Sequence, residues 1–211
     1  MSESNNTREY LSVAVRRERL LDAAADVVAE SGGAALTLRR VAERAGVAHR
    51  VVNYAFGSKD ELVVALLGRE SRRIMTVVWE PALAEVPLER AVERALTAFV
   101  EELSVRPSLH RGVAQLTAEA RSVDSPGAER EAEAYLTAIG SRLAEWCERT
   151  GATLTLPMDI VATTILVAAD GLASWWLTTE DDARASDVIA TLARAFEGLA
   201  VTSDRAAEER A

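Results

Sequence analysis

Two short helical segments that meet at a glycine, between Thr37 and Phe56, constrain the fold of this chain more than any other feature of its sequence. Ala42 and Gly46 lie four residues apart, and Val52 follows six residues later. A small residue lets the first helix pack closely on the second, a glycine suits a left-handed turn, and a branched apolar residue anchors the second helix to a core. This spacing predicts a helix-turn-helix.

The rest of the chain also has apolar residues at the three- and four-residue spacing of helices, and we find no repeat and no pair of strands in it. A first helix is predicted to begin at Arg16, Thr37 can cap a second, a third spans residues 48–56, and a long one begins near Lys59. Further helices are predicted at residues 88–104, 108–121, 128–150, 157–178 and 186–201. The composition is rich in Ala, Leu, Arg and Glu and poor in Pro, which agrees with an all-α fold.

The breaks between these segments divide the chain into four parts. They are a flexible N-terminal arm (1–15), a three-helix domain with the helix-turn-helix (16–60), a bundle of about six helices (61–201) and a flexible tail (202–211). Of the net charge of −9, residues 1–60 carry +1, from nine basic and eight acidic residues, and the rest carries −10, from fifteen and twenty-five. Such a head can bind DNA through a local basic face, while the acidic body repels phosphate and orients the head.

Composition also limits the classes of site that the chain can hold. Its single cysteine, Cys147, excludes an internal disulfide and a cysteine-only metal cluster, so we predict no metal and no cofactor. The N-terminus lacks the apolar run of a signal peptide. The richest apolar run, residues 160–177, is interrupted by polar residues and falls short of the ~20 residues needed to span a bilayer. We therefore expect a cytoplasmic protein without a membrane partner.

The stretches TLRRVAERAGV, over residues 37–47, and FGSKDEL, over residues 56–62, resemble the TetR family of bacterial transcriptional regulators. The resemblance is close over residues 16–67, and three helices followed by about six is also the layout of that family. It implies a DNA-binding head whose third helix enters the major groove, and a body that holds an effector pocket and a dimer interface. The expected protein is a ligand-responsive repressor that binds a palindromic operator on double-stranded DNA as a homodimer.

The third helix supplies most of the residues that we expect to contact DNA. Arg50 can pair with guanine and Asn53 with adenine, each through two hydrogen bonds. The resemblance places Lys59, the only lysine of the chain, at a DNA phosphate. It begins a helix where Ser58 and Glu61 have the spacing of a capping box, and free helix amides favour an anion there. The expected DNA-binding residues are Thr37, Arg39, His49, Arg50, Asn53, Tyr54 and Lys59.

Three positions of the third helix depart from the family pattern. Ala48 stands where a capping serine is common, Asn53 where tyrosine is common, and Ala55 where histidine or tyrosine is common. These departures favour one alternative, a helical small-molecule-binding protein that has lost specific DNA binding. An enzyme is a weaker rival, because the sequence has no phosphate loop, paired histidines or nucleophile motif. We therefore predict no catalytic residue.

The body offers bulky residues that can line a mainly apolar pocket for an unknown small-molecule effector. The candidates are Met75, Trp79, Phe99, Leu116, Tyr135, Trp146 and Trp175. Asp170 interrupts an apolar helix, so its carboxylate should be paired or partly wet. Two roles stay open for it, a structural one at the dimer interface and contact with a cationic effector.

The last two long helices are the expected dimer interface. Gly171 permits close approach of helices, and apolar residues form a stripe on the final helix. The candidate interface residues are Ile165, Gly171, Ile189, Leu192 and Phe196. An effector that shifts the fourth helix would change the spacing of the two heads, and both release from DNA and tighter binding are compatible with the sequence.

Overall fold

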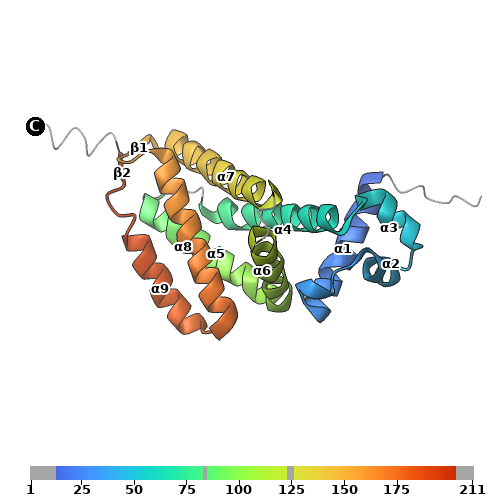
Figure 1. Cartoon of the computed structure of the whole chain (residues 1–211). Coiled ribbons are helices and arrows are strands. Elements are labelled where there is room, and N and C mark those ends of the chain that lie inside the picture. The colour runs from blue at the N-terminus through green and yellow to red at the C-terminus, as the bar shows by residue number, and fades with distance from the viewer. Residues whose placement is uncertain (1–12, 83–84, 123–125, 203–211) are drawn as a thin grey trace, which may run out of the picture.

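A computed structural model describes residues 13–82, 85–122 and 126–202 of the chain (Figure 1). Over these residues the chain forms nine α-helices, one 3-10 helix and two short strands. They are α1 (Val13–Ser31), η1 (Gly33–Ala35), α2 (Leu38–Ala45), α3 (His49–Phe56), α4 (Lys59–Ala82), α5 (Leu88–Val105), α6 (Pro107–Ser122), α7 (Pro126–Thr150), β1 (Ala152–Leu154), α8 (Met158–Thr179), α9 (Asp182–Arg194) and β2 (Ala200–Thr202). The predicted order, three N-terminal helices followed by six, is confirmed.

The helix α4 connects the two ends of the molecule. In Figure 1, α1, α2 and α3 gather at one end as a head, and α4 extends from them into a body formed with α5 to α9. Within the body α4 packs along α5, whereas α1 packs on both α2 and α6. The head therefore rests on two elements of the body, α4 and α6.

Two hydrophobic cores follow this arrangement. The core of the head includes Leu62 and Leu66 from α4 and Leu109 and Leu116 from α6, in addition to residues of α1 to α3. The core of the body is built from α4, α5, α7, α8 and α9. A fully buried leucine stabilises a fold by roughly 1.5–3 kcal/mol. The packing of the head thus crosses the boundary after residue 60, and a functional boundary at that residue stays a prediction.

A pair of short strands near the C-terminus corrects the expectation that the chain has none. The strands β1 and β2 run antiparallel, with Ala152 opposite Thr202 and Leu154 opposite Ala200. Each strand has only three residues, too few for a detectable alternation of apolar and polar side chains. The pair fastens the chain after α9 to the end of α7.

The final helix occupies residues 182–194 instead of the predicted 186–201. Asp181 sets its start, because its carboxylate accepts a hydrogen bond from the amide of Arg184 at 3.0 Å. The chain after the helix turns at Gly198, whose φ of 78° is left-handed, and enters β2. Asp181, which lies in an acidic stretch of the sequence, is therefore the N-terminal cap of α9.

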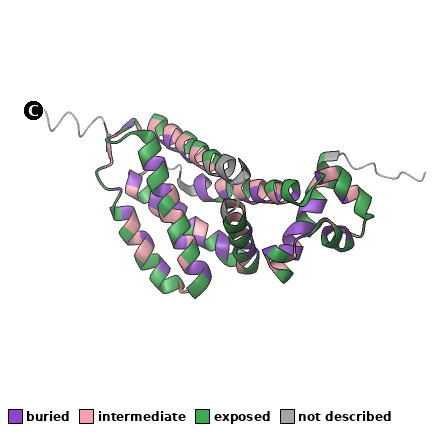
Figure 2. Cartoon of the chain, in the orientation of Figure 1, coloured by how far each residue is buried: buried purple, intermediate pink, exposed green. Residues whose placement is uncertain are grey.

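The helix α8 is more apolar than the sequence-based prediction allowed. By length and composition it is the described helix that could cross a membrane, with a mean hydropathy of 1.6 over its most apolar window. It packs against α5, α6, α7 and α9, and Figure 2 shows buried and exposed residues alternating along it. One face of the helix belongs to the body core, and another faces outwards.

Candidate nucleic-acid interface and ligand pocket

The turn between α2 and α3 has the geometry that the spacing predicted. Thr37 caps α2, with its hydroxyl accepting a hydrogen bond from the amide of Arg40 at 3.2 Å. Gly46 ends the helix in the left-handed conformation, with φ 65°, which a side chain would disfavour. The amide of Val47 then donates to the carbonyl of Ala42 at 3.0 Å. These bonds fix the direction in which α3 leaves the turn.

The helix α3 has one buried face and one exposed face. Val52 and Phe56 are almost completely buried in the head core. The predicted base-contacting residues His49, Arg50, Asn53 and Tyr54 are all exposed, and Tyr54 is 89% exposed. An arginine and an asparagine presented side by side can form paired hydrogen bonds with base edges. The N-cap of this helix, Ala48, makes no side-chain hydrogen bond, as its residue type predicts.

Arg17 holds the C-terminal end of α3 against α1. Its guanidinium donates a hydrogen bond to the carbonyl of Ala55 and lies over the ring of Phe56, 4.4 Å from its centroid. A cation over an aromatic face is favourable, and the hydrogen bond satisfies a carbonyl at the helix end. Sequence analysis did not identify Arg17, because it lies 38 residues from Ala55 in the chain.

Lys59 is the first residue of α4 and is exposed beside the C-terminal end of α3. Ser58 caps α4, accepting a hydrogen bond from the amide of Glu61 at 3.1 Å, as predicted. The return bond of a capping box is absent, since the amide of Ser58 donates to the carbonyl of Phe56 at 2.8 Å. The ammonium of Lys59 therefore projects from a helix N-terminus, where backbone amides also favour an anion.

Two arginines of α2, Arg39 and Arg44, differ in how freely their side chains could reach DNA. Arg39 is exposed and pairs with Glu43 at 2.9 Å. Because an exposed ion pair contributes little, a phosphate could take the place of the Glu43 carboxylate at little cost. Arg44 instead bridges Asp26 at 3.1 Å and Glu30 at 2.7 Å, and these carboxylates raise the pKa of its guanidinium. Arg44 thus ties α2 to α1.

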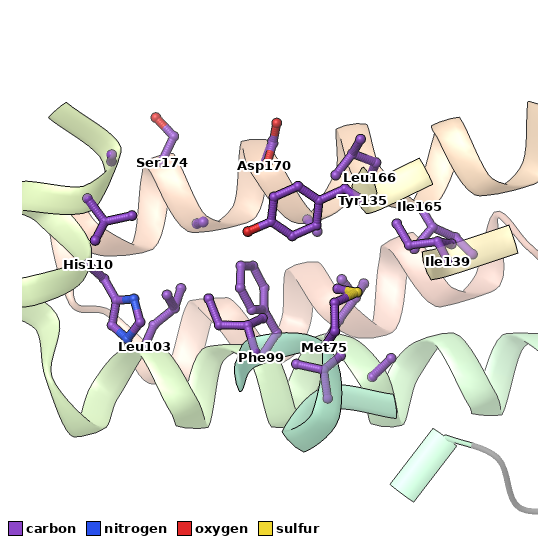
Figure 3. Close-up of a pocket in the computed structure, with 18 of the residues that line it drawn as sticks. Met75, Phe99, Leu103, His110, Tyr135, Ile139, Ile165, Leu166, Asp170 and Ser174 are labelled. Atoms are coloured by element: carbon purple, nitrogen blue, oxygen red, sulfur yellow. The ribbon is translucent and has the colours of Figure 1, made fainter. Parts of the chain in front are cut away.

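The body encloses a cavity of about 340 Å³ between α4, α5, α6, α7 and α8 (Figure 3). Four predicted pocket residues line it: Met75, Trp79, Phe99 and Tyr135. Its wall is mainly apolar, with a few polar groups, as is usual for small-molecule pockets. In Figure 3 the ring of Tyr135 lies between α8 and the opposite wall formed by Phe99 and Met75.

The other three predicted pocket residues lie elsewhere. Leu116 belongs to the head core, because the face of α6 that carries it packs on α1. Trp146 is buried in the body core, and its indole donates to the carbonyl of Val86 at 3.1 Å. Trp175 packs partly buried against the same core without lining the cavity. Size and apolar character alone did not separate the cavity wall from the cores.

Two residues of the cavity wall each have a buried nitrogen atom that finds no hydrogen-bond partner among the described residues. These atoms are Nε1 of Trp79, which is 4% exposed, and Nε2 of His110, which is 3% exposed. Burial lowers the pKa of His110, and the neighbouring Glu70 opposes that effect in part. His110 is therefore neutral at pH 7. His110 is not among the predicted site residues, and only the fold brings it to the cavity.

A buried ionic cluster lies behind His110. Glu70, only 2% exposed, pairs with Arg69 at 2.6 Å, and Arg73 pairs with the buried Glu102 at 2.9 Å. Arg69 also reaches Asp22 of α1 at 2.7 Å. Buried charges persist only when they are paired, so this cluster fixes α4 against α5 and α1.

The predicted dimer residues separate into two groups. Ile165, Ile189 and Phe196 are at most 4% exposed and pack into the core of their own protomer, and Ile165 also lines the cavity, so their place at a dimer interface stays a prediction. Leu192 is half-buried against that core, whereas Gly171 is exposed. The apolar stripe of α9 stabilises the single chain, because α9 packs on α5.

Asp170 lines the cavity at its exposed edge. In Figure 3 its carboxylate, like the hydroxyl of Ser174, points away from Phe99 and the opposite wall. The carboxylate is thus partly wet, as its position in an apolar helix requires. Neither of its two predicted roles is decided by this position.

Residues 20–66 match the sequence model of the bacterial regulatory proteins of the tetR family. An HTH-type transcriptional repressor of Mycobacterium tuberculosis is 39% identical over 75 residues, which are 36% of this chain and 39% of that protein. The chain thus matches about two fifths of that curated relative. The family match over residues 20–66 covers most of α1, all of α2 and α3, and the start of α4.

Solved structures extend the similarity to the whole fold. A transcriptional regulator from Rhodococcus sp. Rha1 superposes with a TM-score of 0.70 at 23% identity, over 86% of this chain and 96% of the other. The multidrug binding protein EbrR, solved in complex with imidazole, superposes with a TM-score of 0.63 at 28% identity, over 84% and 89% of the two chains.

Proposed function

Because the chain belongs to the TetR family of bacterial regulatory proteins, we propose that it is a ligand-responsive transcriptional repressor that binds a palindromic operator as a homodimer. The observation that carries the proposal is the two-sided helix α3. Val52 and Phe56 lock one face into the head, and Arg50 and Asn53 stand exposed on the other. We propose no enzymatic activity, and we expect the protein to act in the cytoplasm on double-stranded DNA.

Lys59, Thr37 and Arg39 are proposed to place the head on the phosphate backbone. All three are exposed and lie at or near the N-termini of α2 and α4. Phosphate contacts fix orientation and register, and base contacts supply the sequence preference. The two operator half-sites that a two-fold dimer contacts would have their centres about 34–36 Å apart.

The outer face of α8 supports the proposed dimer. Ile160, Thr164, Val167 and Gly171 follow one another at helical spacing and are all exposed. In the single chain Val167 is 66% exposed and Ile160 is 49% exposed. A second copy of α8 related by a two-fold axis would cover this stripe, and Gly171 would allow close approach.

The helix α6 is the proposed link between effector and DNA. His110, Val113 and Thr117 line the cavity, and the adjacent face of the same helix places Leu109 and Leu116 in the head core. An effector that moves α6 would therefore move α1 as well. A coupling of ~1–3 kcal/mol would change operator affinity roughly 5–150-fold.

The test is selection of bound duplexes from a random pool by the purified protein, at two salt concentrations. We expect a palindromic motif whose affinity falls as salt rises, because phosphate contacts release counterions. Failure to enrich any sequence, alone and with cell extract added, would favour the small-molecule-binding alternative that Ala48, Asn53 and Ala55 raise.

A further inference from the structure

We infer that the cavity in the body binds an uncharged, largely apolar small molecule with a hydrogen-bond acceptor at one end, for Trp79, and a hydroxyl group at the other, for His110. The inference rests on the proposed function, since it assigns a chemical class to the effector. It follows from the two unpartnered nitrogens, from the charges of the wall and from the size of the cavity.

The indole of Trp79 requires an acceptor. Its N–H can only donate, and it is buried in the cavity wall without a partner. Two other buried tryptophans are satisfied within the chain. Trp146 donates to the carbonyl of Val86 at 3.1 Å, and Trp176 donates to the carboxylate of Asp182 at 2.9 Å. A buried donor is normally paired, so the exception at the cavity points to a ligand oxygen.

The imidazole of His110 requires a hydroxyl group. Its Nε2 atom is buried and has no hydrogen-bond partner among the described residues. Each nitrogen of a neutral imidazole either donates or accepts a hydrogen bond, and the tautomer decides which. A ligand hydroxyl would satisfy Nε2 in either tautomer, because it can both donate and accept.

The charges of the wall exclude an anionic ligand from the interior. Among the residues that the structure describes, no lysine or arginine lines the cavity, and the one charged residue is Asp170, at the exposed edge. The nearby Arg73 is already paired with Glu102 at 2.9 Å. Because Asp170 points away from the opposite wall in Figure 3, the interior holds no carboxylate for a buried cation either. An ion would be desolvated there without a counter-charge.

The dimensions of the cavity favour a small, elongated molecule. Its volume of about 340 Å³ is near the lower limit for small-molecule sites, ~300–1,000 Å³. Glu70, the acidic neighbour of His110, and Trp79 are nine residues apart on α4, on the order of 13 Å at the helical rise. The two polar ends are thus separated by apolar residues such as Met75 and Phe99.

The probe is an unbranched eleven-carbon chain with a hydroxyl at one end and a methyl ketone at the other. Matched analogues lack the hydroxyl, lack the ketone, or end in a carboxylate or an ammonium group. Isothermal titration calorimetry measures the affinity of each for the purified full-length protein. We expect the hydroxyketone to bind most tightly, and the carboxylate and ammonium analogues to bind most weakly.

Three variants assign the two ends of the ligand. Trp79→Phe should lower the affinity for both ligands that carry a ketone on the order of tenfold, because one hydrogen bond is lost. It should leave the affinity for the analogue without a ketone unchanged. His110→Asn, whose side chain is shorter and uncharged, should weaken the binding of only the ligands with a hydroxyl, by a similar factor. Trp146→Phe is the matched control, because it removes an indole N–H outside the cavity and should change no affinity.

Three results would overturn the inference: no binding of the hydroxyketone by the wild type, tighter binding of an ionic analogue, or variant effects that do not depend on the ligand group. The comparison of analogues on the wild-type protein needs no variant to fold. Operator selection stays a separate measurement. A protein that selects a palindrome but does not bind the hydroxyketone would refute the ligand class and leave the repressor intact, and the reverse result would refute the repressor alone.

Discussion

Arg50 and Lys59 are both exposed beside α3, but their expected contributions to DNA binding differ. Replacing Arg50 by alanine should relax the preference at one base position by about 1–3 kcal/mol, because a base contact is lost. Replacing Lys59 by alanine should weaken binding to all duplexes alike and lower the salt slope by about one, because a phosphate contact is lost. Fluorescence anisotropy with matched and mismatched duplexes over a salt series measures both.

The control for these variants is Arg72→Ala. Arg72 is also exposed on α4, 13 residues beyond Lys59 and therefore about 20 Å further along the helix. Its removal should leave both the salt slope and the base preference unchanged. Equal affinity of the Lys59→Ala and wild-type proteins for every duplex would refute the proposed phosphate contact.

His110 makes the stability of the body depend on pH. Burial lowers its pKa in the folded chain, Glu70 opposes this, and Arg73 and Arg106 reinforce it, whereas the unfolded chain protonates near 6.5. Below that pH the unfolded state binds a proton that the folded state does not, so stability falls as pH falls. Denaturant unfolding at pH 7.5 and 5.5 should show wild type losing up to about 1 kcal/mol more than His110→Asn. Parallel losses in both proteins would contradict this origin.

Residue types were sufficient to predict which side chains of the head are exposed, but not which groups of the body lack partners. Helical periodicity puts Val52 inside and Arg50 outside, since both depend only on neighbours along one helix. The unpartnered state of Trp79 and His110 depends on four other helices. Nothing in the sequence distinguishes Trp79 from Trp146, which is satisfied by a carbonyl 60 residues away.

At the scale of elements, the contact of α6 with α1 depends on a glycine. A Cβ on Gly112 would lie 2.4 Å from Cγ1 of Val28, so Gly112→Ala should force α6 away from α1. We expect a loss of about 1–3 kcal/mol in the free energy of unfolding, measured by denaturant titration. The matched control is Gly140→Ala on α7, where the added methyl meets nothing within 4 Å. It should be neutral or stabilising by up to about 1 kcal/mol, because alanine is the better helix former. Equal effects of the two substitutions would show that the contact is not tight.

Most helix boundaries could be predicted because they depend on local chemistry. Thr37, Gly46 and Ser58 set the ends of α2 and the start of α4 by bonds to residues within four positions. The last helix begins and ends earlier than predicted, and its earlier start follows from the cap that the carboxylate of Asp181 provides. The strand pair joins residues 152–154 to residues 200–202, and no local sequence pattern indicates a contact over that separation.

At the scale of the whole molecule, the sequence shows where an apolar stripe lies on a helix but not which surface covers it. The stripe predicted on the last helix has the spacing of an interface, but Ile189 of α9 and Phe196, which follows α9, are buried within their own chain. The stripe of α8 through Val167 remains exposed. Periodicity identifies an apolar face but does not say whether the same chain or a second copy covers it, since both bury it by the same hydrophobic effect.

The exposed stripe of α8 therefore allows a test of the proposed homodimer. Val167→Glu places a charge on the proposed two-fold interface, where it would meet its own copy, and should convert the dimer into monomers. Val105→Glu is the matched control, because Val105 is 64% exposed against 66% for Val167 but lies at the end of α5. Sedimentation velocity at micromolar concentration should give monomers for the first variant and dimers for the second. The monomer should also lose operator affinity, because one head makes too few contacts. Dimers of Val167→Glu with unchanged stability would place the interface on another face of the body.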